Sequence, residues 1–112
     1  MYDHKVLRSV AIRAVYSPGS LTLGAVAGAT GGTTIVTVSA GNSGTNYAYK
    51  KNPASRATYN MTGTAYAGTT LTSGTTEIEA KEGDIIEVVN LVSSKVANVG
   101  YLTVKAGEIA TA

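Results

Sequence analysis

The 112-residue sequence contains no cysteine, no phenylalanine and no tryptophan. Without cysteine, the chain can form neither a disulfide framework nor a thiolate zinc site, and it has no cysteine nucleophile. Without Phe and Trp, the apolar volume of a core must come from Val, Ile, Leu and Ala, and the seven Tyr are the only aromatic residues. These absences exclude disulfide-stapled scaffolds and thiol-dependent enzymes.

Charged residues and long apolar runs are also scarce. Charged residues make up 14% of the chain, and a net charge of +2 is too small to indicate a specific nucleic-acid partner. No run of 18 apolar residues is present, so we expect neither a transmembrane helix nor a membrane partner. Lys5, Arg8 and Arg13 interrupt the position where a signal peptide has its apolar region. We therefore expect a soluble protein that is made and assembled in a cytoplasm.

Threonine and other β-branched residues are abundant in short segments, and glycine-rich turns separate these segments. This composition is typical of an all-β protein with many short strands. A chain of this length suits one domain with a single modest core. We expect no helix, because the Thr and Gly content opposes one.

Strand-like segments recur at the spacing expected for a β-sandwich. We expect strands at residues 21–27, 33–39, 46–51, around Ile78, at 85–92 and at 99–105. Residues 85–92 are apolar at nearly every position, which predicts a central strand covered on both faces. Turns are expected at "KEGD", where Gly83 supplies a left-handed conformation, and at "SSKVAN". The polar residues 52–73 carry no clear pattern and are expected to hold one or two short irregular strands.

These elements predict an antiparallel immunoglobulin-like β-sandwich of about seven strands. The predicted boundaries are an N-terminal extended arm at 1–18, the sandwich at 19–108 and a short C-terminal tail at 109–112, with "SPGS" separating the arm from the sandwich. Alternation along the strands predicts the buried core residues Val36, Ile78, Ile86, Val88, Leu102 and Val104.

Few residues suggest catalysis or metal binding. His4 is the only histidine and lies near the chain start, where an isolated solvated imidazole is the plainest interpretation. The acidic residues Glu77, Glu79, Glu82 and Asp84 lack the spacing of a calcium loop, so we interpret them as a solvated edge and hairpin turn. We therefore expect no catalytic residue, no metal, no cofactor and no enzymatic activity.

Tyrosines and basic residues gather in the middle of the chain. The set comprises Tyr47, Tyr49, Lys50, Lys51, Arg56, Tyr59 and Tyr66. Three interpretations are open: Tyr47 and Tyr49 cover the ends of a core that lacks Phe and Trp, the set forms a protein interface, or it binds single-stranded nucleic acid or sugar.

Charge divides unevenly along the chain. Residues 1–60 carry six basic side chains and one acidic one, whereas residues 61–112 carry three basic and six acidic ones. Such asymmetry favours attraction to an acidic partner or to a neighbouring copy, although two solvated faces that merely differ in charge would give the same counts.

The order of segments across residues 20–106 resembles a known group of viral modules. The resemblance is carried by "SLTLGAVAGATGGTTIVTVS", then "GNSGTNYAYK", then "TLTSGTTEIEAKEGDIIEVVNLVSSKVANVGYLTVKA". Together they resemble the small immunoglobulin-like modules of tailed-phage virion proteins, especially of phages that infect Firmicutes, where such modules are fused to major capsid proteins or act as separate head-decoration proteins. The chain departs from them by lacking an aromatic residue after the Tyr-rich strand and by its additional arm.

The resemblance implies a non-enzymatic virion structural protein on the capsid surface, which reinforces the shell or displays a binding surface. Its implied partner is the major capsid protein, with several copies or a homo-oligomer on each particle. The alternative function is an extracellular or surface adhesion or carbohydrate-binding module, with a host-surface glycan as the partner.

The arm offers a route to attachment. An extended segment can add to the edge of another sheet, where main-chain bonds bind and alternate side chains select. The predicted interface residues are Lys5, Arg8, Val10, Ile12 and Arg13 of the arm, with Tyr47, Tyr49 and Lys50. In the competing interpretation, residues 5–16 are simply the first strand of the sandwich.

Overall fold

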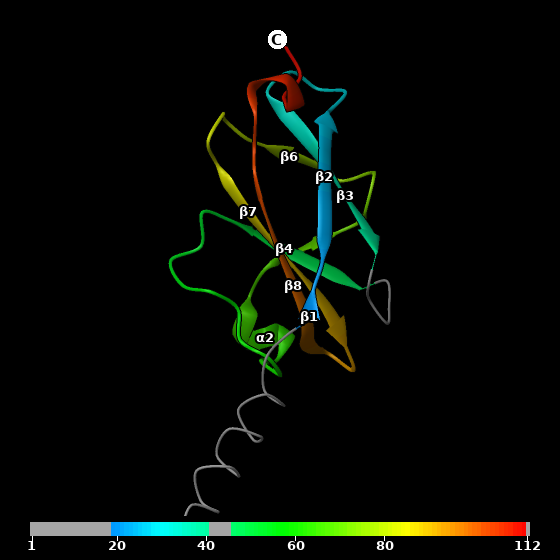
Figure 1. The fold of residues 1–112 in the computed structure, drawn as a ribbon, viewed down its shortest axis with the longest axis vertical. Helices are drawn as coiled ribbons and strands as arrows, with labels where there is room; N and C mark the ends of the chain where they lie inside the picture. Colours follow the sequence, from blue (N-terminus) through cyan, green and yellow to red (C-terminus); the bar gives the residue numbers. More distant parts are fainter. Residues whose placement is uncertain (1–18, 41–45, 112) are drawn as a thin grey trace, which may run out of the picture.

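The computed structural model describes residues 19–40 and 46–111, which form two packed β-sheets (Figure 1). The predicted arm, including Lys5, Arg8, Val10, Ile12 and Arg13, lies outside the described residues. Within the described chain, nearly all regular structure is strand, so the prediction of an all-β sandwich is confirmed.

The larger sheet has five strands in the order β1-β8-β7-β4-β5. Their bounds are β1 Gly19–Ser20, β8 Lys95–Thr103, β7 Ile85–Val92, β4 Tyr47–Lys51 and β5 Thr69–Leu71. The smaller sheet has the order β2-β3-β6, with β2 Thr22–Ala27, β3 Thr33–Ala40 and β6 Glu77–Glu79. All strand pairs are antiparallel except β1 with β8, which run parallel.

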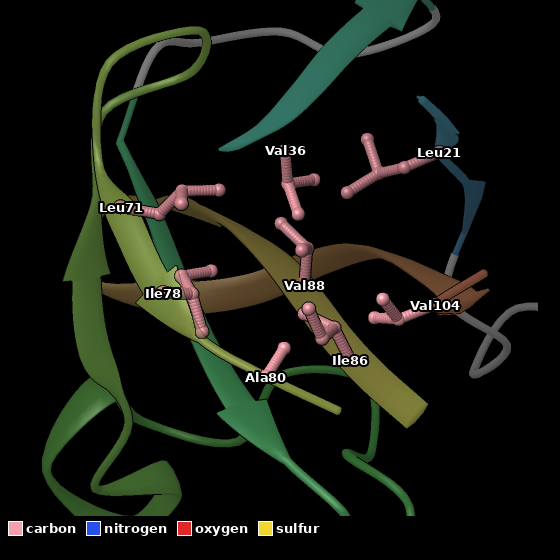
Figure 2. Packing of buried hydrophobic residues seen from close by; sticks show 8 residues of the cluster. All are labelled: Leu21, Val36, Leu71, Ile78, Ala80, Ile86, Val88 and Val104. Atoms are coloured by element: carbon pink, nitrogen blue, oxygen red, sulfur yellow. The ribbon is translucent and has the colours of Figure 1, made fainter. Parts of the chain in front are cut away.

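The main core lies between the two sheets and contains only aliphatic side chains at its centre. Figure 2 shows these residues converging from both sheets: Leu21, Val36, Leu71, Ile78, Ala80, Ile86, Val88 and Val104. Five of the six predicted core residues are buried, whereas Leu102 is only partly buried. Leu102 lies on β8, whose outer neighbour β1 is only two residues long, so its side chain is incompletely covered.

The turn at the end of β7 is shorter than the sequence suggested. "SSKVAN" was expected to be a turn, but β8 already begins at Lys95, opposite Val92. Ser93 and Ser94 alone make the connection, both with positive φ, of 52° and 64°. Two consecutive left-handed residues form a tight hairpin turn that matches the strand twist, so the next four residues belong to β8. At "KEGD", Gly83 has the predicted left-handed conformation, with φ of 93°.

Two short helical turns correct the expectation of no helix: α2 at Gly63–Tyr66 and η1 at Ala106–Glu108. Thr62 caps α2 by accepting a hydrogen bond from the Ala65 amide at 3.1 Å, and Ala67 ends the helix in the left-handed conformation. A single capped turn needs little intrinsic propensity when a buried side chain holds it, as Tyr66 does here.

The ends of the sandwich differ in charge. Ala110 lies beside Thr33, and Ala80 beside Gly32, so the C-terminal residues, β6 and the 28–32 turn share one end. In Figure 1 this end is uppermost, while β1 lies low in the view. The end carries Glu77, Glu79, Glu82, Asp84 and Glu108, together with Lys81 and Lys105. Among the described acidic residues, only Glu87 lies elsewhere.

Candidate functional site

A covering segment, residues 52–68, lies over the outer face of the five-stranded sheet, the face turned away from the smaller sheet (Figure 1). A second apolar cluster fills the space beneath it. The sheet supplies Ala48, Val89, Val96 and Val99, and the segment supplies Ala57 and Tyr66. Strand β7 is therefore buried on both faces, as its continuous apolar run predicts.

Glu87 lies at the centre of this outer face and is fully buried. Its Oε1 accepts a hydrogen bond from the Tyr66 hydroxyl at 2.8 Å. Its Oε2 accepts two, from the Tyr101 hydroxyl at 2.7 Å and from the Ala57 amide at 2.9 Å. A buried carboxylate is costly unless its oxygens are paired, and here both oxygens have donors.

The pKa values of Tyr66 and Tyr101 are both raised near this carboxylate. Burial and the hydrogen bond to Glu87 raise the pKa of Tyr66 well above its ordinary value. The same two causes raise the pKa of Tyr101 to about 12. Both phenols therefore remain protonated donors at neutral pH, as a stable bond to the carboxylate requires.

Two cations flank the tyrosines. The Nζ atom of Lys50 lies 4.5 Å from the centre of the Tyr66 ring. The guanidinium carbon of Arg56 lies 4.9 Å from the centre of the Tyr101 ring. Each contact is a cation–π interaction, and these are strongest where the ring is screened from water.

The arrangement holds the fold together and leaves Glu87 no free oxygen for a substrate. Two of its three donors, the Ala57 amide and the Tyr66 hydroxyl, belong to the covering segment, and Tyr101 belongs to β8. Glu87 thus links the covering segment to the sheet through buried hydrogen bonds. A general acid or base must instead reach the proton that it transfers.

The structure separates the tyrosines that the sequence grouped together. Tyr47 and Tyr49 are half-buried and pack against the main core between the sheets, whereas Lys50 points to the outer face. Tyr47 and Tyr49 thus lie on the other face of β4 from Lys50, although Tyr49 and Lys50 both line one hollow of about 610 Å³. This placement corresponds to the interpretation in which Tyr47 and Tyr49 complete a core that lacks larger aromatic residues.

The acidic residues near β6 are engaged locally. Glu77 accepts hydrogen bonds from the Thr30 amide and the Thr33 hydroxyl, which lower its pKa. Asp84 accepts from the Lys81 amide and the Asn52 side chain, which lower its pKa. Over residues 19–40 and 46–111, no group of three or more potential ligands is placed to hold a metal ion.

Hollows of about 1060, 610 and 350 Å³ open on the surface of the described chain. The smallest of these three, called the smaller hollow below, is lined by residues 52–56 of the covering segment with Ile85 and Tyr101. The largest of the three lies where β4, α2, β5 and the β7–β8 turn meet. Seven of its lining residues are Thr or Ser: Thr62, Thr64, Thr70, Thr72, Ser73, Ser93 and Ser94. Lys95 is its one charged lining residue.

Sequence reasoning missed the Glu87 cluster, although a signal was present. Glu87 interrupts an otherwise apolar central strand, and a charged residue there must either be buried with partners or mark an exposed face. Its partners Ala57, Tyr66 and Tyr101 lie 14 to 30 residues away in the chain. No local spacing links them.

Comparison with known proteins found no matching family model, no similar curated protein and no similar solved structure. Of the helices in the described chain, none has the length and apolar character needed to cross a membrane.

Proposed function

We propose that the protein is a non-enzymatic structural protein of a tailed-phage virion, which decorates the outer surface of the capsid. The resemblance of residues 20–106 to phage immunoglobulin-like modules leads to this proposal. Its implied partner is the major capsid protein, bound by several copies on each particle. The polar cluster of the described chain is consistent with a structural role, because Glu87 serves the fold.

The order of strands supports an immunoglobulin-like module. Strands β2, β3 and β6 lie in one sheet, and β4, β7 and β8 lie in the other. Taken in chain order, they correspond to strands A, B, E and C, F, G of an immunoglobulin sandwich. Strand β5 pairs with β4 rather than with β6, which extends the sheet that contains the C, F and G equivalents.

The observation that carries the proposal best is the position of β2. In an immunoglobulin sandwich the first strand pairs with the second. Here β2, Thr22–Ala27, pairs with β3 over six residues and fills that position. The sandwich is thus complete at this place without residues 5–16, which favours a docking arm over a first strand.

The distribution of charge along the molecule indicates how the protein would be oriented on the capsid. The described chain enters at Gly19, beside β8, and the acidic residues gather at the opposite end, with η1 (Figure 1). The sequence before Gly19 carries Lys5, Arg8 and Arg13. In the proposed orientation, the basic segment faces an acidic capsid surface and the acidic end faces outward.

Co-sedimentation with purified capsids tests the proposal. The full chain is expected to pellet with capsids, and a chain beginning at Ser17 is expected to unfold cooperatively but to stay in the supernatant. An Arg8→Glu/Arg13→Glu variant should bind less than a Lys81→Glu/Lys105→Glu variant, which reverses two cations at the acidic end. Pelleting of the shortened chain with undiminished affinity would remove the arm from the account. Failure of the full chain to pellet would remove the capsid.

A carbohydrate-binding module is the second candidate function, and the hydroxyl-lined hollow favours it. The side chains of Thr64, Thr70, Thr72, Ser93 and Ser94 have no hydrogen-bond partner within the described chain. Hydroxyl groups can both donate to and accept from sugar hydroxyls. Binding of host-surface glycans that is lost in a Thr70→Val/Thr72→Val variant, without binding to capsids, would favour this function over decoration.

A further inference from the structure

The smaller hollow gathers side chains of the kinds that dominate binding energy at protein interfaces. Five large apolar residues of the described chain are exposed, and two of them, Ile85 and Tyr101, line this one hollow. Ile85 is 43% exposed and Tyr101 is 38% exposed. Residues 52–56, which include Pro53 and Arg56, complete its lining. Aromatic residues and arginine around an apolar floor are typical of interface hot spots.

The walls of the hollow are fixed before any partner arrives. The Asn52 amide donates to the Ile85 carbonyl at 2.6 Å, and the Ile85 amide donates to Asn52 Oδ1 at 2.8 Å. On the other side, Glu87 holds the Tyr101 hydroxyl and the Ala57 amide. The covering segment and β7 thus cannot separate without breaking these bonds. A preformed site avoids much of the ordering cost of binding.

The charge at the rim selects the partner. Arg56 stacks on the Tyr101 ring, and no carboxylate of the described chain forms an ion pair with it. A guanidinium keeps its charge at all physiological pH values and binds carboxylates through paired hydrogen bonds. Arg56 is the one charged side chain that lines the hollow.

We propose that this hollow binds an extended segment of a partner protein in which an aliphatic side chain is flanked by carboxylates. The aliphatic side chain contacts Ile85, Pro53 and the exposed part of Tyr101, and a neighbouring carboxylate pairs with Arg56. A volume of about 350 Å³ suits one or two side chains rather than a whole domain. The inference does not depend on the virion proposal, because it concerns the chemistry of the segment and not its source.

Titration of the full chain, labelled with ¹⁵N, against short capped peptides tests the inference. The probe peptide has the sequence Gly-Glu-Leu-Glu-Gly, and the matched peptides replace Leu by Ala or both Glu by Lys. The probe is expected to shift the amide signals of residues 52–56, Ile85 and Tyr101, with a Kd of roughly 0.1–1 mM, as suits so small a ligand. Both matched peptides are expected to bind at least about fivefold more weakly, a change of about 1 kcal/mol.

Two variants and a control separate binding from folding. Arg56→Ala and Ile85→Ala should each weaken the probe at least about fivefold while the remaining amide signals keep their positions. Val26→Ala, at the exposed apolar residue of β2, should leave the affinity unchanged. Equal binding of all three peptides, or signal shifts centred outside the hollow, would overturn the inference. Concentration-dependent shifts at the same amides without peptide would also overturn it, because the occupant would then be a second copy.

Discussion

The Tyr66 hydroxyl donates a hydrogen bond to Glu87 Oε1 at 2.8 Å, and both side chains are almost completely shielded from water. Tyr66 belongs to α2 in the covering segment, and Glu87 belongs to the central strand β7. This bond therefore joins the covering segment to the sheet, together with the bond from the Ala57 amide to Glu87 and the two bonds between Asn52 and Ile85.

Removing the two phenolic hydroxyl groups separately should show which donor matters more. Tyr66→Phe leaves Oε1 of a buried carboxylate without a donor, so we expect the free energy of unfolding to fall by about 1.5–3 kcal/mol. Tyr101→Phe should cost less, because Oε2 keeps the Ala57 amide and Tyr101 is 38% exposed. Urea titration measures both. An equal or larger loss in Tyr101→Phe would show that Glu87 is not held as described.

Alkaline pH should weaken the same cluster. The pKa values of Tyr66 and Tyr101 are raised above the ordinary value of 10.0, so the unfolded chain loses these phenolic protons before the folded one does. The stability that they contribute is complete below pH 10 and falls as pH rises through the folded pKa of Tyr101, about 12. A Tyr66→Phe/Tyr101→Phe variant should lose less stability over that range than the parent protein or Tyr59→Phe. Parallel pH profiles would contradict this.

Adjacent isoleucines on β7 provide a matched test of which face is buried. Ile86 is fully buried in the main core, whereas Ile85 is 43% exposed. Ile86→Ala is expected to lower the free energy of unfolding by about 2–5 kcal/mol and Ile85→Ala by less than about 1 kcal/mol. Similar losses in guanidinium titrations of the two variants would mean that the register of β7 is wrong.

Gly100 of β8 lies directly against Leu21 in the β1–β2 connection. A Cβ atom at this position would lie 2.9 Å from both the Cβ and the carbonyl oxygen of Leu21. Because Leu21 is a buried core residue, its backbone has little room to move. Gly100→Ala should therefore lower the melting temperature, whereas Gly107→Ala, where a Cβ meets open space, should not. An unchanged melting temperature in Gly100→Ala would place the connection elsewhere.

The main core could be predicted because each strand there carries its own signal. Val36, Ile78, Ile86, Val88 and Val104 are buried where alternation or a continuous apolar run places them. The period of two also places Tyr47 and Tyr49 on one face of β4, but it does not show that this face is the inner one. The period of two shows which residues share a face of a strand. Which of the two faces is buried depends on how the second sheet packs.

The covering segment and the Glu87 cluster could not be predicted for a different reason. Residues 52–68 contain one helical turn and otherwise irregular chain, so no periodicity exists to be read. Their position depends on long-range bonds from Ala57 and Tyr66 to Glu87. Such long-range contacts depend on the tertiary structure and not on the residues nearby in the sequence.

The central claim, the proposed structural role on a phage capsid, is tested most directly by quantitative mass spectrometry of purified virions. The account predicts that the protein is present in a fixed ratio to the major capsid protein, and that a protease which leaves the shell intact removes it. Absence of the protein from virions that infect normally, with the protein recovered only from the lysate, would contradict it.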